Sequence, residues 1–254
     1  MKVLLAELAN GDYFDRAVLT HKPWNPESLL WLGCALMLAL VPGAAVANLF
    51  EAGSVAQMAA NVTVLPVAIL VSVIVWLQAN RRVYRQSLRL ADVFGFARGN
   101  TVRCLLLGLG TGLMLVIIAM MLAWCTNELL KAFGDEAEPQ KLVTLIAEEA
   151  AKPDRTASLI FFVVMAVAVA PIAEEILFRG ILYPAIKQIG YPSLAAISTA
   201  ILFALFHVNL LTFASLTVVA LGLIAVYEFT DNLLAPITAH AVFNASNLIM
   251  LFSQ

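Results

Sequence analysis

Long apolar stretches separated by short polar breaks dominate the chain. Seven of them read as membrane-crossing helices, because a helix needs about 20 mostly apolar residues to span a bilayer. The last three follow one another with few polar breaks, which leaves room for an eighth element. The pattern predicts an all-α, polytopic transmembrane helix bundle. Its expected helices cover residues 28–50, 62–77, 104–125, 157–172, 194–206, 211–227 and 233–252.

The composition supports this interpretation. The 254 residues are 62% hydrophobic and 13% charged, with a mean hydropathy of +0.91, whereas soluble domains are about 45–50% apolar and about 25% charged. The net charge of −2 gives no indication of a nucleic-acid partner, so the expected surroundings are the lipid bilayer. Cys34, Cys104 and Cys125 lie in or beside apolar stretches, at spacings that suit neither disulfides nor a zinc site.

Lysine and arginine positions predict the orientation, since cytoplasmic loops are enriched in both. Six arginines follow the second apolar stretch and mark that side as cytosolic: Arg81, Arg82, Arg85, Arg89, Arg98 and Arg103. We therefore divide the chain into a cytosolic leader (1–27), N-terminal transmembrane helices (28–125), an acidic extracytoplasmic connection (126–156) and a second helix bundle (157–252).

Two adjacent glutamates stand where the fourth stretch continues past its apolar run. Ionisable residues within spanning helices are costly and usually functional. Glu175 has Arg179 four residues on, on the same helix face, so a purely structural ion pair explains this glutamate well. Glu174 points about 100° away on the helix, and the arginine does not explain it. Glu174 is therefore the better candidate for chemistry.

Two histidines also stand within apolar segments. His207 follows Phe203 by four residues, and His240 precedes Asn244 by four. A lone histidine in an apolar helix is more often a packed core residue than a catalytic one. Two of the chain's three histidines, in the same group of helices as a glutamate pair, form a stronger signal than any one of them.

These residue types permit hydrolysis. A carboxylate in apolar surroundings can be tuned to take a proton from water. A histidine can orient that water or protonate the leaving amine, and an asparagine amide can donate to the developing oxyanion. Alternatively, Glu174, His207 and His240 could hold a divalent metal such as zinc with open coordination positions. The chain has no His-Glu-x-x-His helix.

Chain geometry adds an expectation about heights in the bundle. A turn at residues 190–192 leaves Glu174 and His207 level, each roughly 23–24 Å away at about 1.5 Å per residue. His240 lies only about 9 residues past a turn at 230–232, which would leave it roughly 15 Å from that level. We therefore expect the fifth helix to run past Asn209 and to reverse near residues 214–215.

The motifs resemble those of the CAAX prenyl protease and bacteriocin-processing (CPBP, or Abi) family of intramembrane endopeptidases. The resemblance covers about residues 157–250 and includes the run 222–228. One departure is Asp231-Asn232 after Thr230, where the family often has Thr-Gly. The matching motifs are Glu174-Glu175-x-x-x-Arg179, Phe203-x-x-x-His207 and His240-x-x-x-Asn244.

The resemblance implies a helical bundle whose site faces the cytosolic leaflet. In it, Glu174 would activate water, His207 and His240 would support it, and Asn244 would stabilise the oxyanion. Glu175, Arg179 and Phe203 would have supporting roles. The family has been described both as metal-dependent and as glutamate-based. We favour a metal-free site, because Glu175 already has a partner in Arg179.

The expected function is an intramembrane endopeptidase, a hydrolase of a bacterial plasma membrane that cleaves a membrane-bound or lipidated peptide or protein. Which substrate it cleaves, and whether prenylation matters, stays open. A non-catalytic bacteriocin-immunity or membrane-binding protein that kept the site is one alternative. A small transporter that uses Glu174, His207 and His240 as a proton relay is another, although the chain lacks two matching halves with broken helices.

Overall fold

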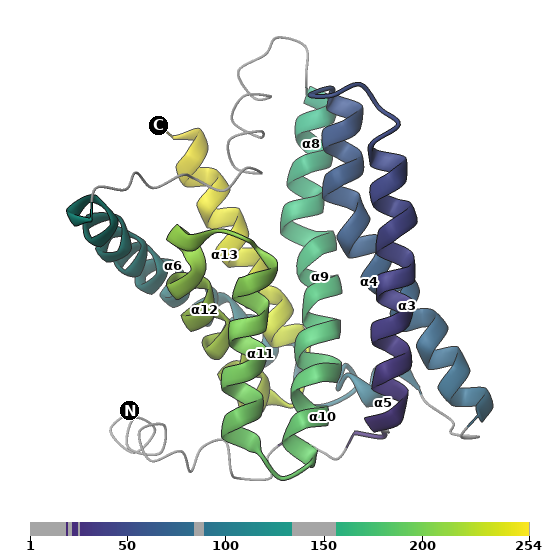
Figure 1. The fold of residues 1–254 in the computed structure, drawn as a ribbon. Coiled ribbons are helices and arrows are strands. Elements are labelled where there is room, and N and C mark those ends of the chain that lie inside the picture. Colours follow the sequence, from purple (N-terminus) through teal and green to yellow (C-terminus); the bar gives the residue numbers. More distant parts are fainter. Residues whose placement is uncertain (1–18, 20–21, 25, 84–88, 134–155, 254) are drawn as a thin grey trace, which may run out of the picture.

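The computed structural model describes residues 19, 22–24, 26–83, 89–133 and 156–253. Of these residues, 85% are helical and none forms a strand. Among the described residues, six helices are long and apolar enough to cross a membrane, and a further apolar helix is shorter. The chain is therefore an integral multi-pass membrane protein, and the predicted helix bundle is confirmed (Figure 1). Most of the leader, Arg85 and residues 134–155 of the predicted connection lie outside the described residues.

The N-terminal region contains three long helices and one short one. They are α3 (Pro26–Ala47), α4 (Val55–Val83), α5 (Leu90–Val93) and α6 (Thr101–Ala132). Helix α6 continues to Ala132, beyond residue 125, where the apolar stretch was expected to end. Hydropathy marks only the apolar part of a helix, whereas backbone hydrogen bonds continue through its polar end. There, Lys131 pairs with Glu128 at 3.0 Å.

One long span follows, from Thr156 to Gln188. It consists of α8 (Thr156–Val164), the π-helical η1 (Met165–Val169), α9 (Ala170–Glu175), the π-helical η2 (Ile176–Leu182) and α10 (Tyr183–Gln188). In Figure 1, α3 and α4 lie along one side of this long helix, whereas α6 and the three helices of residues 192–252 lie on the other. The expectation that the fourth helix continues through the glutamate pair is confirmed.

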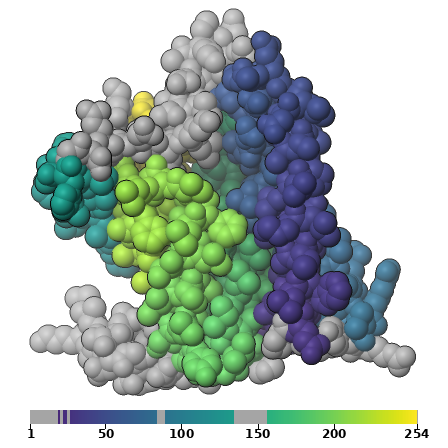
Figure 2. All heavy atoms as spheres, viewed as in Figure 1, coloured from purple at the N-terminus to yellow at the C-terminus, as the bar shows by residue number. Residues whose placement is uncertain are grey.

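The last three helices are α11 (Pro192–Phe206), α12 (Leu210–Thr230) and α13 (Leu234–Phe252). No further element lies among them in residues 192–252, all of which are described. The predicted extension of the fifth helix past Asn209 is wrong. The chain reverses at once, since Val208 has φ of +45° and Asn209 caps α12 by accepting from the backbone N–H of Thr212. The α11–α12 hairpin consequently ends well below the tops of α3 and α4 (Figures 1 and 2).

Each π-helical segment precedes a proline. In η1 the N–H of Ala170 bonds to the carbonyl of Met165, five residues back. The next bond of this series would join residue 171 to the carbonyl of Ala166, but Pro171 has no N–H. Likewise, Pro184 cannot donate to the carbonyl of Gly180, four residues back, in α-helical fashion. The helix widens at both places, and α9 with its two glutamates lies between them. Such segments are frequent at functional sites.

Candidate active site

A cavity of about 460 Å³ lies between α4, the long central helix and α11. Its polar lining is sparse: Glu174 from α9, His207 at the end of α11, and Asn61 from α4. Phe178, Phe203 and Phe206 are among the apolar residues that surround the two titratable groups. The prediction that Glu174 and His207 lie at one height is consistent with this shared cavity.

Glu174 and Glu175 have different surroundings, as their helical spacing predicts. The side chain of Glu175 is fully buried, and its Oε1 accepts from Arg179 Nη1 at 2.8 Å and from His240 Nδ1 at 2.8 Å. The side chain of Glu174 is 13% exposed, and its Oε2 lies 3.8 Å from Nε2 of His240. Arg179 also donates from Nη2 to the carbonyl of Ala220 at 3.1 Å. Glu175 thus orients both a cation and a histidine, while Glu174 faces the cavity.

The orientations of the histidines follow from their acceptors. A carbonyl oxygen can only accept, so the contact of 2.9 Å between His207 Nδ1 and the carbonyl of Phe203 places a proton on Nδ1. In the neutral ring the lone pair of His207 is then on Nε2. By the same reasoning, Glu175 holds the proton of His240 on Nδ1, which leaves Nε2 toward Glu174. Such fixed tautomers are expected of catalytic imidazoles.

Phe203 links the parts of the site. Its ring centroid lies 4.9 Å from that of His207 and 5.7 Å from that of His240. The guanidinium carbon of Arg179 lies 4.7 Å from the same ring, a distance typical of a cation–π contact. Phe203 therefore separates the two imidazoles and covers the buried ion pair.

Asn244 is not among the cavity-lining residues, but it contacts one of them, Ala166. Its Nδ2 donates to the carbonyl of Ala166 at 2.7 Å, the carbonyl that loses a donor because residue 171 is proline. One amide N–H of Asn244 therefore stabilises η1, the segment immediately before the glutamates.

His240 reaches the glutamates because the α12–α13 turn lies inside the bundle. Leu233 lies close against Gly180, with its Cδ1 3.1 Å from where a Cβ of that glycine would be. From Gly180 to Glu174 is six residues, and from Leu233 to His240 seven, which correspond to about 9 and about 10.5 Å of rise. The expected difference in height between His240 and Glu174 rested on the assumption that the turns at residues 190–192 and 230–232 lie at one level. The turn is instead raised, and a longer fifth helix is unnecessary.

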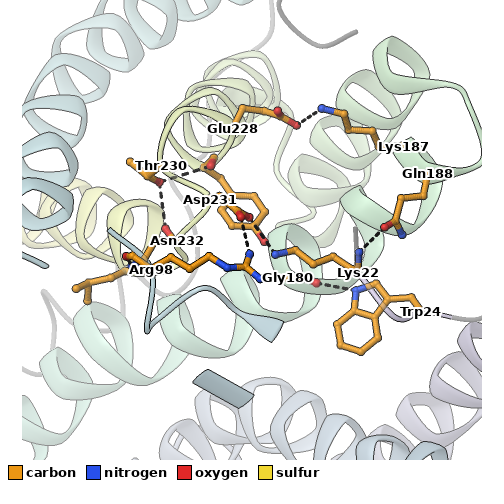
Figure 3. Close-up of polar contacts among 12 residues, drawn as sticks. Lys22, Trp24, Arg98, Gly180, Lys187, Gln188, Glu228, Thr230, Asp231 and Asn232 are labelled. Carbon is orange, nitrogen blue, oxygen red and sulfur yellow. Dashed lines mark hydrogen bonds and ion pairs between the residues drawn. The ribbon is translucent and has the colours of Figure 1, made fainter. Parts of the chain in front are cut away.

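Buried polar contacts hold this turn in place (Figure 3). Asp231 pairs with Lys22 Nζ at 3.0 Å and with Arg98, and Asn232 donates to the carbonyl of Arg98 at 2.8 Å. Gly95, with φ of +77°, approaches so closely that a Cβ would lie 2.0 Å from the carbonyl of Asp231. Burial lowers the pKa of Lys22, and Asp231 offsets part of this effect. The turn can lie this deep because its charges are paired.

A second contact from the N-terminal region supports η2. The indole of Trp24 donates to the carbonyl of Gly180 at 3.0 Å, the carbonyl that Pro184 leaves without an α-helical donor. Figure 3 shows this contact beside the Lys22–Asp231 pair. Both π-helical segments thus receive a side-chain N–H from another element.

The alternative metal set does not fit the observed arrangement. Within the described residues, no three His, Cys, Asp or Glu side chains are grouped so that they could hold a metal ion. We therefore derive no step through a metal at Glu174, His207 and His240.

Sequence reasoning missed several residues that shape the site. Asn61 stands just before the apolar stretch 62–77, outside every expected helix, although it lines the cavity. Lys22 and Trp24 lay in the predicted leader. The prolines at 171 and 184 were the available signal, because each implies a carbonyl in need of another donor.

Comparison with known proteins supports the motif analysis. Residues 156–246 match the model of a family described as type II CAAX prenyl endopeptidase Rce1-like. The match extends from α8 into α13, includes every residue of the three motifs, and confirms the predicted family. No curated protein and no solved structure matches the chain.

Proposed function

We propose, because residues 156–246 belong to the Rce1-like family of CAAX-type membrane proteases, that this protein is an intramembrane endopeptidase with Glu174 as its general base. One observation supports this assignment above the others. Glu174 faces an apolar cavity while Glu175, its neighbour, holds His240 toward it. One carboxylate is free to react and the other keeps the partner in position.

In the proposed reaction, a water molecule lies between Glu174 Oε2 and His240 Nε2. These atoms are 3.8 Å apart, too far for a direct hydrogen bond and close enough for one water to contact both. Glu174 takes a proton from this water as its oxygen attacks the peptide carbonyl. The proton then passes to the leaving nitrogen as the C–N bond breaks, and the products are a carboxylic acid and an amine.

His207 lies at the cavity wall in a position to assist. With Nδ1 bonded to Phe203, its Nε2 is the nitrogen that can hydrogen-bond to the substrate. In the protonated ring this Nε2–H would donate to the oxyanion or to the leaving nitrogen. Asn244 would contribute to the oxyanion through its second amide N–H, because the first is bonded to the carbonyl of Ala166.

We further propose that the site lies in the cytosolic half of the bilayer. Arg81, Arg82 and Arg89 are exposed at the end of the bundle that we take as cytosolic. Trp24 links Gly180 to Trp76, and the indole of Trp76 donates to the carbonyl of Ser28, where the apolar run of α3 begins. These contacts support a membrane boundary at about this level. Glu174 is six residues beyond Gly180, about 9 Å into the bilayer.

The apolar walls support a substrate that reaches the site from the membrane. Residues of α4 form much of the cavity, and peptides with lipid-soluble side chains or a lipid modification would bury apolar surface there. The apolar lining from this helix is Met58, Val62, Leu65, Pro66 and Ile69.

The function can be tested with detergent-purified protein and fluorogenic peptides, both plain and lipidated. Glu174→Gln preserves size and removes the base, so cleavage should fall by about two to four orders of magnitude. His240→Ala should also reduce it strongly. Glu128→Gln, an exposed glutamate on α6, is the matched control and should cleave like wild type.

Two outcomes would contradict the proposal. Cleavage that survives both site substitutions would rule out this mechanism. Retention of the protein's cellular function by Glu174→Gln would favour a non-catalytic binding or immunity role. A strong chelator added to the same assay addresses metal dependence, and we expect cleavage to continue in its presence.

A further inference from the structure

A stripe of polar side chains runs from the site to the end of the bundle that carries the exposed arginines. Its members on the long central helix recur every four residues: Glu175, Arg179, Tyr183 and Lys187. Helix α12 supplies the opposite side through the carbonyl of Ala220, which accepts from Arg179, and through Glu228. Tyr227, the residue before Glu228 on this helix, adds a buried hydroxyl. Glu228 accepts from Tyr183 and from Lys187, both at 2.6 Å. Figure 3 shows the Lys187–Glu228 pair close to the Asp231 cluster.

This stripe is buried, yet its polar atoms are not all satisfied by protein. In the described residues, six buried side-chain polar atoms have no protein hydrogen-bond partner, and four of them belong to the stripe. Unpaired buried polar atoms are costly, and bound water commonly satisfies them. The four atoms are Glu175 Oε2, Arg179 Nε, Tyr227 OH and Glu228 Oε2.

These atoms are spread along the stripe between the candidate active site and the membrane interface. Lys187, whose side chain is 11% exposed, is beside Glu228 at the outer end. Arg179 is two helical turns further in and donates to Ala220, eight residues before Glu228 on α12. Glu175 Oε2 is at the inner end, in the carboxylate that holds His240. The span from Lys187 to Glu175 is about 18 Å of helix.

The cavity itself is poorly suited to supplying water. Its lining is mostly apolar, and the proposed substrate fills it during the reaction. Hydrolysis nevertheless consumes one water for each bond cleaved. The reaction therefore needs a second, polar route to the glutamates while the cavity is occupied.

We propose that the stripe from Lys187 and Glu228 to Glu175 is a hydrated path along which water reaches the active site from the membrane interface. The substrate comes from the bilayer through the apolar cavity, and water comes along the stripe. This inference rests on the proposed function for its purpose, but the presence of water in the stripe can be measured without any substrate.

X-ray radiolytic footprinting of the purified full-length protein, read by mass spectrometry, tests for that water. Hydroxyl radicals form where water is bound and oxidise the side chains beside it, including buried ones. Tyr183 and Tyr227 are 0% exposed and should nevertheless be labelled. Phe162, 1% exposed in an apolar cluster, should remain at background, and exposed Tyr191 gives the upper reference.

The double variant Lys187→Met with Glu228→Met tests whether water in the stripe supplies the hydrolysis reaction. It replaces both members of the ion pair by apolar side chains of similar size, so no unpaired charge is left buried, although Tyr183 loses Glu228 as its acceptor. Labelling of Tyr183 and Tyr227 should fall to background. The kcat for peptide cleavage should fall about tenfold with KM unchanged, because the cavity is untouched. Glu128→Met with Lys131→Met, the exposed pair on α6, is the matched control and should change neither readout.

Three results would overturn the proposal. Background labelling of both tyrosines in wild type would mean that the stripe is dry. An unchanged kcat in the double variant, with labelling lost, would mean that its water does not supply the reaction. A lowered melting temperature with labelling and kcat retained would assign the stripe a structural role only. If wild type cleaves no peptide, the proposed function fails, and the labelling alone decides whether the path exists.

Discussion

Prolines occur inside helices in both halves of the molecule, with different consequences. Pro42 and Pro66 lie within α3 and α4, which remain α-helical throughout. Pro171 and Pro184 each follow a π-helical segment. In the C-terminal half, side chains from elsewhere donate to the carbonyls concerned, Asn244 in one case and Trp24 in the other. A proline alone therefore does not widen a helix, and the widened form is found where a partner stabilises it.

The two halves also differ in where they place charge. The N-terminal pair of Glu128 and Lys131 is about half exposed at the end of α6. The C-terminal pair of Glu175 and Arg179 also lies within one helix but is at most 1% exposed. The N-terminal helices supply a wall of the cavity, whereas the C-terminal helices contain the buried ion pair of Glu175 and Arg179. Of these two ion pairs, the buried one is therefore the one beside the candidate site, and the comparison can be tested from the largest expected effect to the smallest.

Removing the charge of the glutamate in each ion pair should give the largest difference in the free energy of unfolding. Glu175→Gln leaves Arg179 buried beside a neutral partner and frees His240, so the free energy of unfolding should fall by about 3–5 kcal/mol. Glu128→Gln should change it by less than about 0.5 kcal/mol. Thermal unfolding in detergent measures both. Equal effects would mean that burial does not distinguish the two pairs.

Substitution in the turn before His240 should have the next largest effect on stability. Asp231→Asn weakens the pairing with Lys22 and Arg98, and a loss of about 2 kcal/mol is expected, because the amide oxygen still accepts a hydrogen bond. Cleavage should fall through kcat as His240 moves away from Glu174. Asp92→Asn, an exposed change in α5, is the control. A stable Asp231 variant with wild-type kcat would disprove this positioning role.

Close packing between the halves gives a third comparison. A Cβ at Gly112 of α6 would lie 2.6 Å from the carbonyl of Ala239, next to His240, whereas one at Gly110 would meet nothing within 4 Å. Gly112→Ala should destabilise the protein by about 1–3 kcal/mol and reduce cleavage. Gly110→Ala should be neutral or slightly stabilising. Melting curves of the two variants check this, and identical curves would contradict the observed α6–α13 contact.

The smallest effect concerns the indole that bonds to η2. Trp24→Phe keeps a ring beside Trp76 but removes the donor to the carbonyl of Gly180, which should cost about 1–2 kcal/mol. Trp124→Phe changes a 66% exposed indole and should have no effect. Hydrogen exchange of the amides around residues 180–185 should increase only in the Trp24 variant. Unchanged exchange there would show that η2 does not depend on this contact.

Much of the site could be predicted because it depends on the spacing of residues that are close together in the sequence. Helical spacing alone separated Glu174 from Glu175, since a residue four positions away is a neighbour and the next residue is not. The apolar stretches likewise located the helices, although their ends were misjudged where polar residues continue a helix. The π-helical segments were not predicted, because their form depends on donors that lie more than 70 residues away in the chain.

The sequence by itself determined that the chain crosses a membrane, which family its motifs resemble, and which residues we propose to carry the chemistry. Hydropathy and residue spacing encode these properties over short distances. Only the tertiary structure decided how high each turn lies, and therefore that His240 meets the glutamates without a longer fifth helix. That height depends on whether buried charges find partners, and Asp231 finds Lys22 more than 200 positions earlier in the chain.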